Sequence, residues 1–479
     1  MTTEGIEIIH IEGVSDGTFS LINDYVVVGA YTYRLFKNNA SGTDPDNWYL
    51  RSEYDPTEPT DPTDPTDPTD PTDPTDPTDP TDPTDPTDPT DPTDPTDPTD
   101  PTDPTDPTDP TDPIDPTDPI DPTDPVDPSN PGVKPEYHVG APVYEVYPQA
   151  LLGLNGLPTM RQRLGNRMWM GAGNLQIAQG ADAITAYADS IESGALVVSN
   201  GVWGQIEGGY GKYATHGSLT DTDYNQSKLK LTIGIDGILG ETADGTFIGG
   251  LFVHYVHGKT KTNSVYYADG EITTDGYGIG GTLTWFGNNG FYIDGQAQVT
   301  RYSSDLVTYA PHAPTLVSGN HALGYAVSIE AGQRINLTPE WSITPQAQLV
   351  YSSVNFDSFT DGFGSRIGLD RGNSLQGRIG FTVDYERSWQ NAKGMTDRIH
   401  LYGLANVYNE FIDGTKVDLS GVTFASKNDR VWGGIGVGGS YNWNDDQFSI
   451  FGEAKVDTSL NNFGDSYNVK GNIGLRIKW

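Results

Sequence analysis

Side chains that could carry out catalysis or hold a metal are few in this sequence and poorly grouped. His254 and His257 lie three residues apart in a strand-like run, so they point to opposite faces and make a poor metal pair. The "GDS" of Gly464–Ser466 could indicate a serine hydrolase, but it falls where a turn enters the last run. The glycines of "GIGVGG" at 434–439 match a phosphate loop only weakly. Because no H-E-x-x-H, P-loop or nucleophile-elbow motif is present, we expect no enzyme, no cofactor and no metal.

The elements that would position such residues are strand-like runs, which begin near Gly201 and continue to the end of the chain. In "KLKLTIGIDGIL" at 228–239, apolar residues alternate with polar ones, which is the period of a strand with two different faces. About twelve such runs are present. They lie near 201–214, 227–240, 245–261, 271–287, 290–305, 319–336, 339–356, 372–388, 397–411, 430–444, 446–458 and 466–479.

The length of these runs favours a membrane barrel over a soluble β-sandwich. Many span ten to seventeen residues, whereas strands of globular proteins average about 5–6 residues and a bilayer demands about 9–11. Tight turns such as "NLTPE" alternate with long loops such as "DSFTDGFGSRIGLDRG", which is typical of outer-membrane barrels. Aromatic residues gather near the run ends, as in interfacial girdles. These are Tyr210, Tyr213, Tyr255, Trp285, Phe286, Tyr302, Trp341, Tyr385, Trp389, Tyr441 and Trp443.

The chain ends inside its last strand-like run, "NVKGNIGLRIKW", on an aromatic residue of the apolar face. A closed barrel pairs its last strand with its first and leaves no open edge. The spacing of Asn472, Gly474, Ile477 and Trp479 resembles the C-terminal recognition signal of outer-membrane barrels. We therefore interpret these four residues as a barrel-assembly signal.

A repetitive acidic segment accounts for most of the net charge. From Asp61 to Asp127 an aspartate recurs at every third residue, in "DPT" repeats. The stretch 55–128 holds 25 of the 66 acidic residues and no Lys or Arg, so the rest of the chain carries −14 of the formal charge of −39. Proline at every third residue prevents sheet and helix and favours polyproline II, so we expect a disordered, solvated spacer. The acidic balance argues against nucleic acid as a partner.

The absence of cysteine excludes disulfides and leaves two interpretations open. One is chance or a cytosolic origin, and the other is a chain that crosses an oxidising compartment unfolded. No run of 18 uncharged apolar residues is present, so no transmembrane helix is expected. The start "MTTEGIEIIH" has no signal-peptide pattern. We expect either a cytosolic protein or a true N-terminus that lies upstream.

The chain divides into four parts. Residues 1–54 hold short β-rich runs, too few to bury much core, which we interpret as the last rungs of a larger stack of strands. The repeat linker is 55–131. Residues 132–199 lead into the barrel and include helix-compatible stretches, among them "LPTMRQRLGNR", for which a small surface helix with solvated arginines is the alternative. The barrel is 200–479.

Three stretches resemble the C-terminal half of a monomeric (type Va) autotransporter of the pertactin/AIDA type. "IEIIHIEGVSDGTFSL…VVVGAYTYRLFKNN…NWYLRS" resembles the autochaperone end of a passenger β-helix. "YHVGAPVYEVYPQALLGL…RQRLGNR" resembles the segment held inside the pore, and the twelve runs with Trp479 resemble the translocator barrel. The resemblance implies an all-β fold. It consists of a 12-stranded antiparallel transmembrane β-barrel with a short plug helix, preceded by the linker and a β-helix-like fragment.

The resemblance also implies a function, location and partners. The barrel would export and anchor its own N-terminal passenger at the surface of a Gram-negative cell, in a chain that is truncated or a fragment. The implied partners are the outer-membrane bilayer, barrel-assembly machinery, periplasmic chaperones and the passenger itself, and we expect a monomer. Alternatives are a surface adhesin that binds a host cell, and a pore or barrel enzyme. Some members cleave the passenger with polar groups in the pore, for which alternation offers the candidate lumen acids Glu207, Asp236, Glu330 and Glu453.

Overall fold

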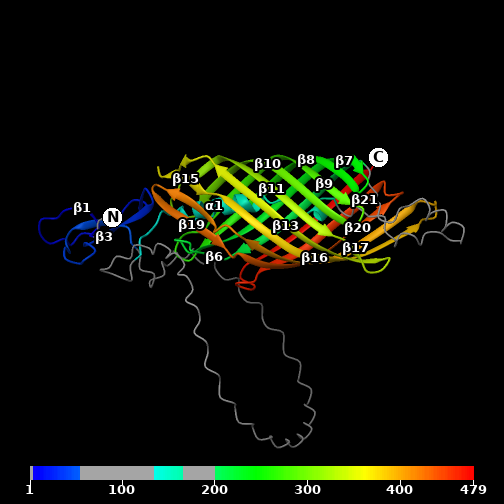
Figure 1. Cartoon of the computed structure of the whole chain (residues 1–479). Helices are drawn as coiled ribbons and strands as arrows, with labels where there is room; N and C mark the ends of the chain where they lie inside the picture. The colour runs from blue at the N-terminus through cyan, green and yellow to red at the C-terminus, as the bar shows by residue number, and fades with distance from the viewer. Residues whose placement is uncertain (1–3, 54–133, 165–199, 479) are drawn as a thin grey trace, which may run out of the picture. The chain divides into compact units, whose positions relative to one another are not determined.

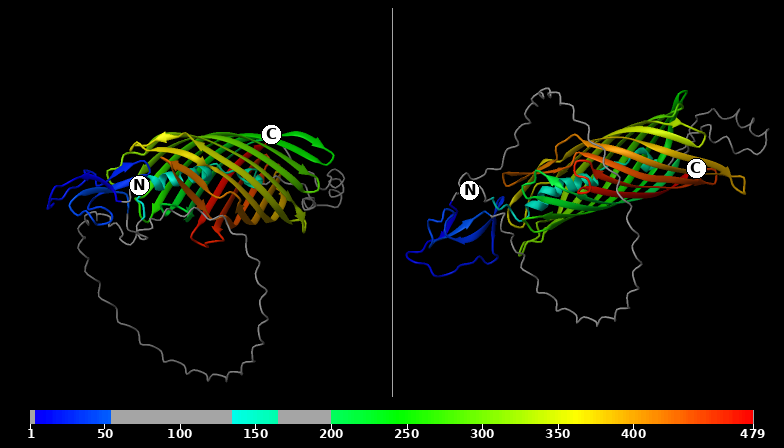
Figure 2. Two further views of the ribbon diagram at one scale, coloured as in Figure 1. Left: turned by 60° about the vertical axis from the view of Figure 1, so that its left-hand side comes forward. Right: turned by 90° about the horizontal axis from the view of Figure 1, so that it is seen from below.

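The computed structural model describes residues 4–53, 134–164 and 200–478, and its main feature is a closed antiparallel barrel of twelve strands (Figures 1 and 2). The strands are β5 Gly201–Tyr213, β7 Thr222–Thr242, β8 Gly245–Ser264, β9 Gly270–Gly287, β10 Phe291–Thr308, β11 Val317–Gln333, β13 Trp341–Phe356, β16 Asn373–Gln390, β17 Thr396–Glu410, β20 Val431–Trp443, β21 Phe448–Ser459 and β22 Tyr467–Lys478. A two-residue strand, β12 Ile335–Asn336, extends the pairing beside β13. The predicted twelve-stranded barrel is confirmed, and each strand corresponds to one of the predicted runs.

Pairing of the last strand with the first closes the barrel. β22 pairs with β5 from Tyr467 opposite Lys212 to Lys478 opposite Gly201. The other neighbours are consecutive along the chain, and β11 pairs with β13 to complete the ring. Every barrel strand therefore has a partner on both sides, so no strand edge is left open.

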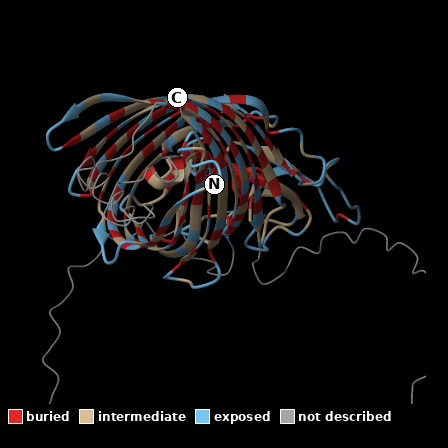
Figure 3. Ribbon diagram, turned by 90° about the vertical axis from the view of Figure 1, so that its right-hand side faces the viewer, coloured by how far each residue is buried: buried red, intermediate tan, exposed pale blue. Residues whose placement is uncertain are grey.

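Alternation along each strand separates an apolar outside from a polar inside. On β7, the side chains of Ile233 and Ile235 are 62% and 54% exposed, whereas Lys230, Thr232 and Asp236 between and beside them are each 5% exposed. Figure 3 shows the strands banded in this way around the ring. A soluble protein buries its apolar residues, so an inverted pattern of this kind indicates that lipid covers the outer face.

The two ends of the barrel differ. One end, called here the tight-turn end, carries the connections 243–244, 288–290, 337–340, 391–395 and 444–447. The other, the long-loop end, carries 214–221, 265–269, 309–316, 357–372, 411–430 and 460–466. The short strands β6 Thr215–His216, β14 Phe359–Thr360, β15 Arg366–Arg371, β18 Thr415–Leu419 and β19 Val422–Asn428 form a second sheet there.

The hairpin of β18 and β19 was not among the predicted runs. Its turn is Ser420–Gly421, where both residues have positive φ, 51° and 92°. Such a two-residue turn between alternating runs is a strong hairpin signal. The inner side chains Val417, Leu419 and Phe424 are buried in the main apolar cluster of the molecule.

The N-terminal part differs from the predicted β-helix-like fragment. Its strands β1 Ile6–Ile9, β2 Val26–Val28, β3 Tyr31–Lys37 and β4 Trp48–Arg51 form a sheet in the order β1-β4-β3-β2, and all three pairings are antiparallel. Rungs of a β-helix pair in parallel and need long crossovers, whereas β2 and β3 are joined by a tight turn at Gly29.

Two helices precede the barrel strands, α1 Ala141–Leu154 and α2 Met160–Leu164. Both correspond to stretches predicted as helix-compatible. In the described part of the chain, no helix has the length and apolar character needed to cross a membrane. The whole of the predicted spacer 55–131 and the last residue, Trp479, lie outside the described residues.

Introducing a charged side chain on the outer face of the barrel tests whether that face contacts lipid. Ile233→Arg should destabilise the barrel by about 2–4 kcal/mol, because an arginine near the bilayer midplane loses hydration. Urea titration of the protein in phospholipid vesicles measures this. The matched control is Val265→Arg, which places the same charge on a side chain 77% exposed in the loop between β8 and β9. An equal effect at both positions would contradict a lipid-facing surface.

Candidate functional site: the barrel lumen and the segment within it

Helix α1 lies inside the barrel and is buried on nearly all sides (Figures 1 and 3). Eleven of its residues are buried, including Tyr144, Tyr147 and Leu151. A helix that is apolar all round belongs in an interior. The wall makes room for it, since a Cβ at Gly258 of β8 would lie 2.6 Å from Leu154 of the helix. The predicted plug helix is therefore present.

Asn155 ends α1 and fixes that end to the barrel wall. Its backbone N–H donates to the carbonyls of the last helical turn, and its side-chain amide donates to Ser352 Oγ at 2.8 Å and the Tyr325 carbonyl at 3.0 Å. Its Oδ1 accepts from Tyr302 Oη at 3.1 Å, and its carbonyl accepts from Gln298 Nε2 at 2.9 Å. The buried amide is thus bonded at both its nitrogen and its oxygen, by strands β10, β11 and β13.

Arg161 of α2 binds an acid on β16, the strand next to β13 in the wall. Its Nη1 pairs with Asp384 of β16, and its guanidinium lies 4.8 Å from the ring centroid of Tyr402 of β17. His400 Nε2 lies 2.8 Å from the same carboxylate. These side chains are largely buried, and such charges are retained in an interior only when they are paired.

Arg163 forms a second buried ion pair on another side of the lumen. Its side chain is 2% exposed and pairs with Asp294 of β10, which is fully buried. Thr284 of β9 donates to the same carboxylate. The alternative of a surface helix with solvated arginines is wrong, because both arginines of α2 are held by lumen acids.

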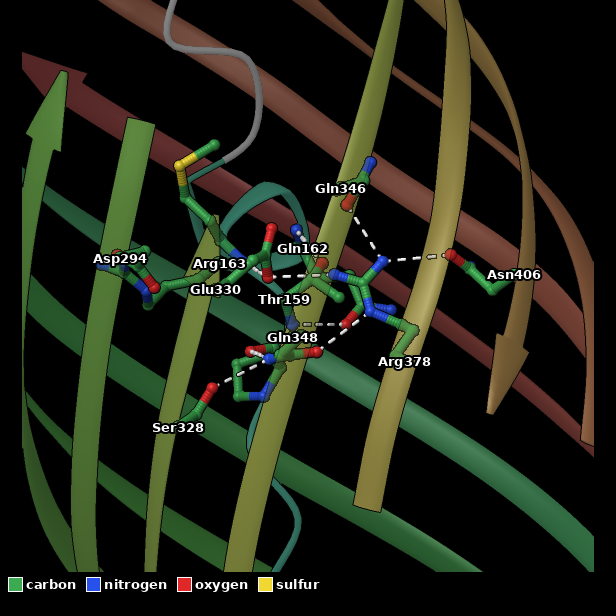
Figure 4. Close-up of polar contacts among 12 residues, drawn as sticks. Thr159, Gln162, Arg163, Asp294, Ser328, Glu330, Gln346, Gln348, Arg378 and Asn406 are labelled. Carbon is green, nitrogen blue, oxygen red and sulfur yellow. Dashed lines mark hydrogen bonds and ion pairs between the residues drawn. The ribbon is translucent and has the colours of Figure 1, made fainter. Parts of the chain in front are cut away.

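Glu330, one of the predicted lumen acids, receives three donors, and Figure 4 shows the contact with one of them, Arg378. The backbone N–H of Met160, at the start of α2, donates at 3.1 Å, and Tyr292 Oη donates at 2.7 Å. Arg378 of β16 pairs with its Oε2 at 3.1 Å. A carboxylate at the first residue of α2 also satisfies one of the free N–H groups there.

Glu453, another predicted lumen acid, also holds α2. Gln162 Nε2 donates to its Oε1 at 2.6 Å, and Tyr402 Oη donates to its Oε2 at 2.9 Å. Asn472 of β22 donates to the Gln162 carbonyl at 3.0 Å. The last strand of the barrel therefore contacts the lumen segment directly through Asn472, one of the residues interpreted as an assembly signal.

The remaining predicted residues also have defined positions. Glu207 pairs with Lys228 at 2.8 Å and Asp236 with Arg476 at 3.7 Å, both across neighbouring parts of the inner wall. Gly474 lies against the Phe451 ring, where a Cβ would meet it at 2.3 Å. Ile477 is 45% exposed on the outer face, and Trp479 lies outside the described residues. Their roles in assembly or cleavage stay predictions.

The chain enters the lumen at the long-loop end. His138 Nε2 lies 2.9 Å from Asp361 Oδ2 in the loop between β13 and β16, and both side chains are fully buried. Tyr144 Oη donates to the same carboxylate at 2.7 Å. Burial would raise the pKa of Asp361, but the hydrogen bonds from His138 and Tyr144 outweigh it and hold the pKa below its ordinary value.

The N-terminal sheet binds the segment just before it enters. The Thr32 N–H donates to the Glu136 carbonyl and the His138 N–H donates to the Ala30 carbonyl, each at 2.9 Å. Arg34 pairs with the Glu136 carboxylate at 2.9 Å. Residues 136–138 thus pair antiparallel with the start of β3 at the long-loop end of the barrel.

Within 4–53, 134–164 and 200–478 there is no group of three or more His, Cys, Asp or Glu side chains placed to hold a metal. His254 is buried inside and His257 is on the outer side beside Asp275, so the two point apart as predicted. Ser466 lies in the connection before β22, where its Oγ accepts a hydrogen bond from the Ala214 N–H at 2.9 Å.

These features define a class of protein. A closed barrel with a lipid-facing exterior holds in its polar lumen a segment of its own chain, which links the N-terminal part to the first barrel strand. A family model described as "Autotransporter beta-domain" matches residues 202–455. The chain belongs to this family of outer-membrane translocator barrels.

Two curated relatives that resemble this chain are also named autotransporters. The chain is 36% identical over 491 residues to the adhesin BmaC autotransporter of Brucella suis, covering 100% of this chain and 12% of that protein. It is 23% identical to the pertactin autotransporter of Bordetella parapertussis, over 50% of this chain and 25% of that protein. The AIDA-I transport unit of Escherichia coli aligns with a TM-score of 0.46 and 19% identity, covering 58% of this chain and 90% of that chain.

We predict that removal of the ion pair between Arg163 and Asp294 weakens the binding of the lumen segment to the barrel wall. Arg163→Gln should destabilise the segment by about 3–5 kcal/mol, because Asp294 is left as an uncompensated buried charge. Single-channel conductance in planar bilayers should then rise. The double variant Arg163→Gln/Asp294→Asn should recover much of the loss, and Arg366→Gln, an exposed arginine of β15, serves as the control. Unchanged conductance in Arg163→Gln would contradict this role.

We predict that acid weakens the contact of Asp361 with His138 and Tyr144, at the point where the chain enters the lumen. Its folded pKa is depressed, so its stabilisation is fully present above the unfolded pKa of about 3.9 and is lost as pH falls through the lower folded value. Asp361→Asn should lower the thermal midpoint at pH 7, and the gap to the parent should close below pH ~4. Asp244→Asn, at an exposed turn, is the control. A gap that is the same at every pH would contradict the assignment.

Proposed function

We propose that the barrel exports its own N-terminal part across the outer membrane and then anchors it at the cell surface. The observation that supports this most is the course of the chain. Residues 134–164 run through the lumen from the long-loop end, where they pair with the N-terminal sheet, towards the tight-turn end, where α2 is held. The first barrel strand then begins at Gly201, at the tight-turn end. This is the course expected of a chain whose N-terminal part has passed through the barrel to the outside while the barrel stays in the membrane.

The energy and partners of export are part of the proposal. No nucleotide-binding motif is seen in the sequence, so folding of the passenger outside would supply the free energy and oppose backsliding. Barrel-assembly machinery and periplasmic chaperones would deliver and insert the barrel through its last strand. We propose a monomer, because the closed ring leaves no barrel strand edge to pair with another copy.

A second candidate is an adhesive role for the displayed part. It is favoured by the Brucella relative, which is named an adhesin and aligns over this whole chain, although the chain spans only 12% of it. Residues 4–53 also present apolar side chains, including Ile8 of β1 at 46% exposure and Ile22 of the turn before β2 at 99%. We propose no catalytic role for the lumen acids, since Glu330 and Glu453 are engaged in holding α2.

Surface accessibility tests export. A secretion signal and an epitope tag are placed ahead of Thr2, and the chain is produced in a Gram-negative host. Protease added to intact cells should remove the tag and leave a protected, heat-modifiable barrel. The tag should be accessible because residues 4–53 lie at the long-loop end, which faces the outside of the cell in this proposal.

A second tag supplies the control for orientation. Placed in the turn 391–395 at the tight-turn end, it should stay protected in intact cells and become sensitive only when the membrane is opened. A protected N-terminal tag on an inserted barrel would overturn the export proposal and leave a pore as the better description.

A further inference from the structure

Three lysines lie in a row across four neighbouring barrel strands. Lys455 of β21 stands directly opposite Lys470 of β22, Lys470 stands opposite Gly209 of β5, and Gly209 stands opposite Lys228 of β7. Residues paired in this way lie at the same level of the wall. Lys228, Lys455 and Lys470 are called here the lysine row.

The lysine row faces the lumen. All three side chains line a cavity of about 300 Å³ that lies between the wall and the segment from Gly153 to Gln162. Gly209 leaves space at the middle of the row, because a Cβ there would lie 3.4 Å from Cγ of Lys470 and 3.5 Å from Cε of Lys228. The two side chains therefore lie over the glycine from either side.

The charges of the row are not balanced. Lys228 pairs with Glu207 at 2.8 Å and Lys455 with Asp457 at 3.0 Å, whereas Lys470 makes no hydrogen bond or ion pair within the described residues. Like charges directly opposite each other in a sheet destabilise it. An anion in the cavity would offset that cost.

The other charged groups lining the cavity have partners of their own. Arg378 pairs with Glu330, and Glu453 accepts from Gln162. Glu410 accepts from Ser374 Oγ and the Leu375 N–H, and Asp429 lies 2.8 Å from His216. Among the four cations that line this cavity, Lys228, Arg378, Lys455 and Lys470, Lys470 is the one without a carboxylate partner in the described part of the chain.

The chain itself supplies a dense set of carboxylates. Its stretch 55–128 holds 25 acidic residues and neither Lys nor Arg. In polyproline II, with three residues per turn and a rise of about 3.1 Å per residue, aspartates at every third position would share one side and recur about every 9 Å. Lys228 and Lys470 are two strand spacings apart, about 10 Å. The separation of Lys228 and Lys470 thus matches that of successive aspartates in the repeat, whereas Lys455 lies one strand spacing, about 5 Å, from Lys470.

We propose that the lysine row binds aspartate carboxylates of the chain's own Asp-Pro-Thr repeat while the repeat passes through the lumen. This inference rests on the proposed export function. Each carboxylate exchanges for the next on the same ammonium groups, so no position along the repeat is favoured and the chain can advance. The row thereby lowers the electrostatic cost of bringing an acidic segment through a confined space.

Export kinetics test the proposal in the full chain with the secretion signal and tag. Lys470→Gln should slow the appearance of the tag at the cell surface by about three- to tenfold, the effect of losing one charge-assisted contact. Lys470→Arg should restore the parental rate, because it keeps the charge. Lys261→Gln, on the exposed outer face of β8, is the matched control. All rates are normalised to the amount of heat-modifiable barrel, so a folding defect is separated from slow export.

A neutral repeat completes the test. When the aspartates from Asp61 to Asp127 are replaced by asparagine, Lys470→Gln should no longer change the rate. An equal defect with acidic and neutral repeats, or no defect with either, overturns the lysine-row proposal while parental export still supports the translocator. A parent chain whose tag never reaches the surface overturns both.

Discussion

The structure depends on one constraint, that backbone polar groups facing hydrocarbon must be paired within the protein. Lipid offers no hydrogen-bond partners, so a sheet can cross a bilayer only when it has no edge. The pairing of β22 with β5 meets this requirement, and it brings distant residues into register, such as Asn472 opposite Glu207, which are 265 positions apart. Closure also fixes which face of each strand points inwards, because a slip by one residue would turn every side chain over.

Closure then creates an interior that must be filled. The long-loop half of the lumen is filled by α1, whose apolar side chains pack with Ile367, Val417 and Phe424 of the second sheet. The tight-turn half is ionic, and α2 is held there by acids from β10, β11, β16 and β21. The apolar half stabilises the lumen segment by burying the side chains of α1. The ionic half fixes where α2 lies, because a charged pair tolerates only a few arrangements.

Most of the fold could be predicted from the alternation of apolar and polar residues along the strands. The contacts between segments far apart in the sequence could not be predicted from it. Alternation predicted the twelve strands, and it also predicted inward directions for Glu330 and Glu453. It could not show that Arg161 meets Asp384, since which lumen residue lies nearest depends on the height and rotation of the segment inside the ring. The hairpin β18–β19 was missed because its strands are short, and the antiparallel order of residues 4–53 depends on pairings that single strands do not specify.

The contacts of α2 also bear on the order of assembly. Its donors and acceptors belong to strands on several sides of the ring, and the last of them, Asn472, lies on β22. The complete set can therefore exist only when β22 has paired with β5 and the ring is closed. Before β22 is in place, the carbonyl of Gln162 would lack its Asn472 donor, whereas Arg161 and Arg163 would keep their partners on β16 and β10. It follows that the final seating of α2 and the final closure of the wall are coupled, each supplying contacts that the other requires.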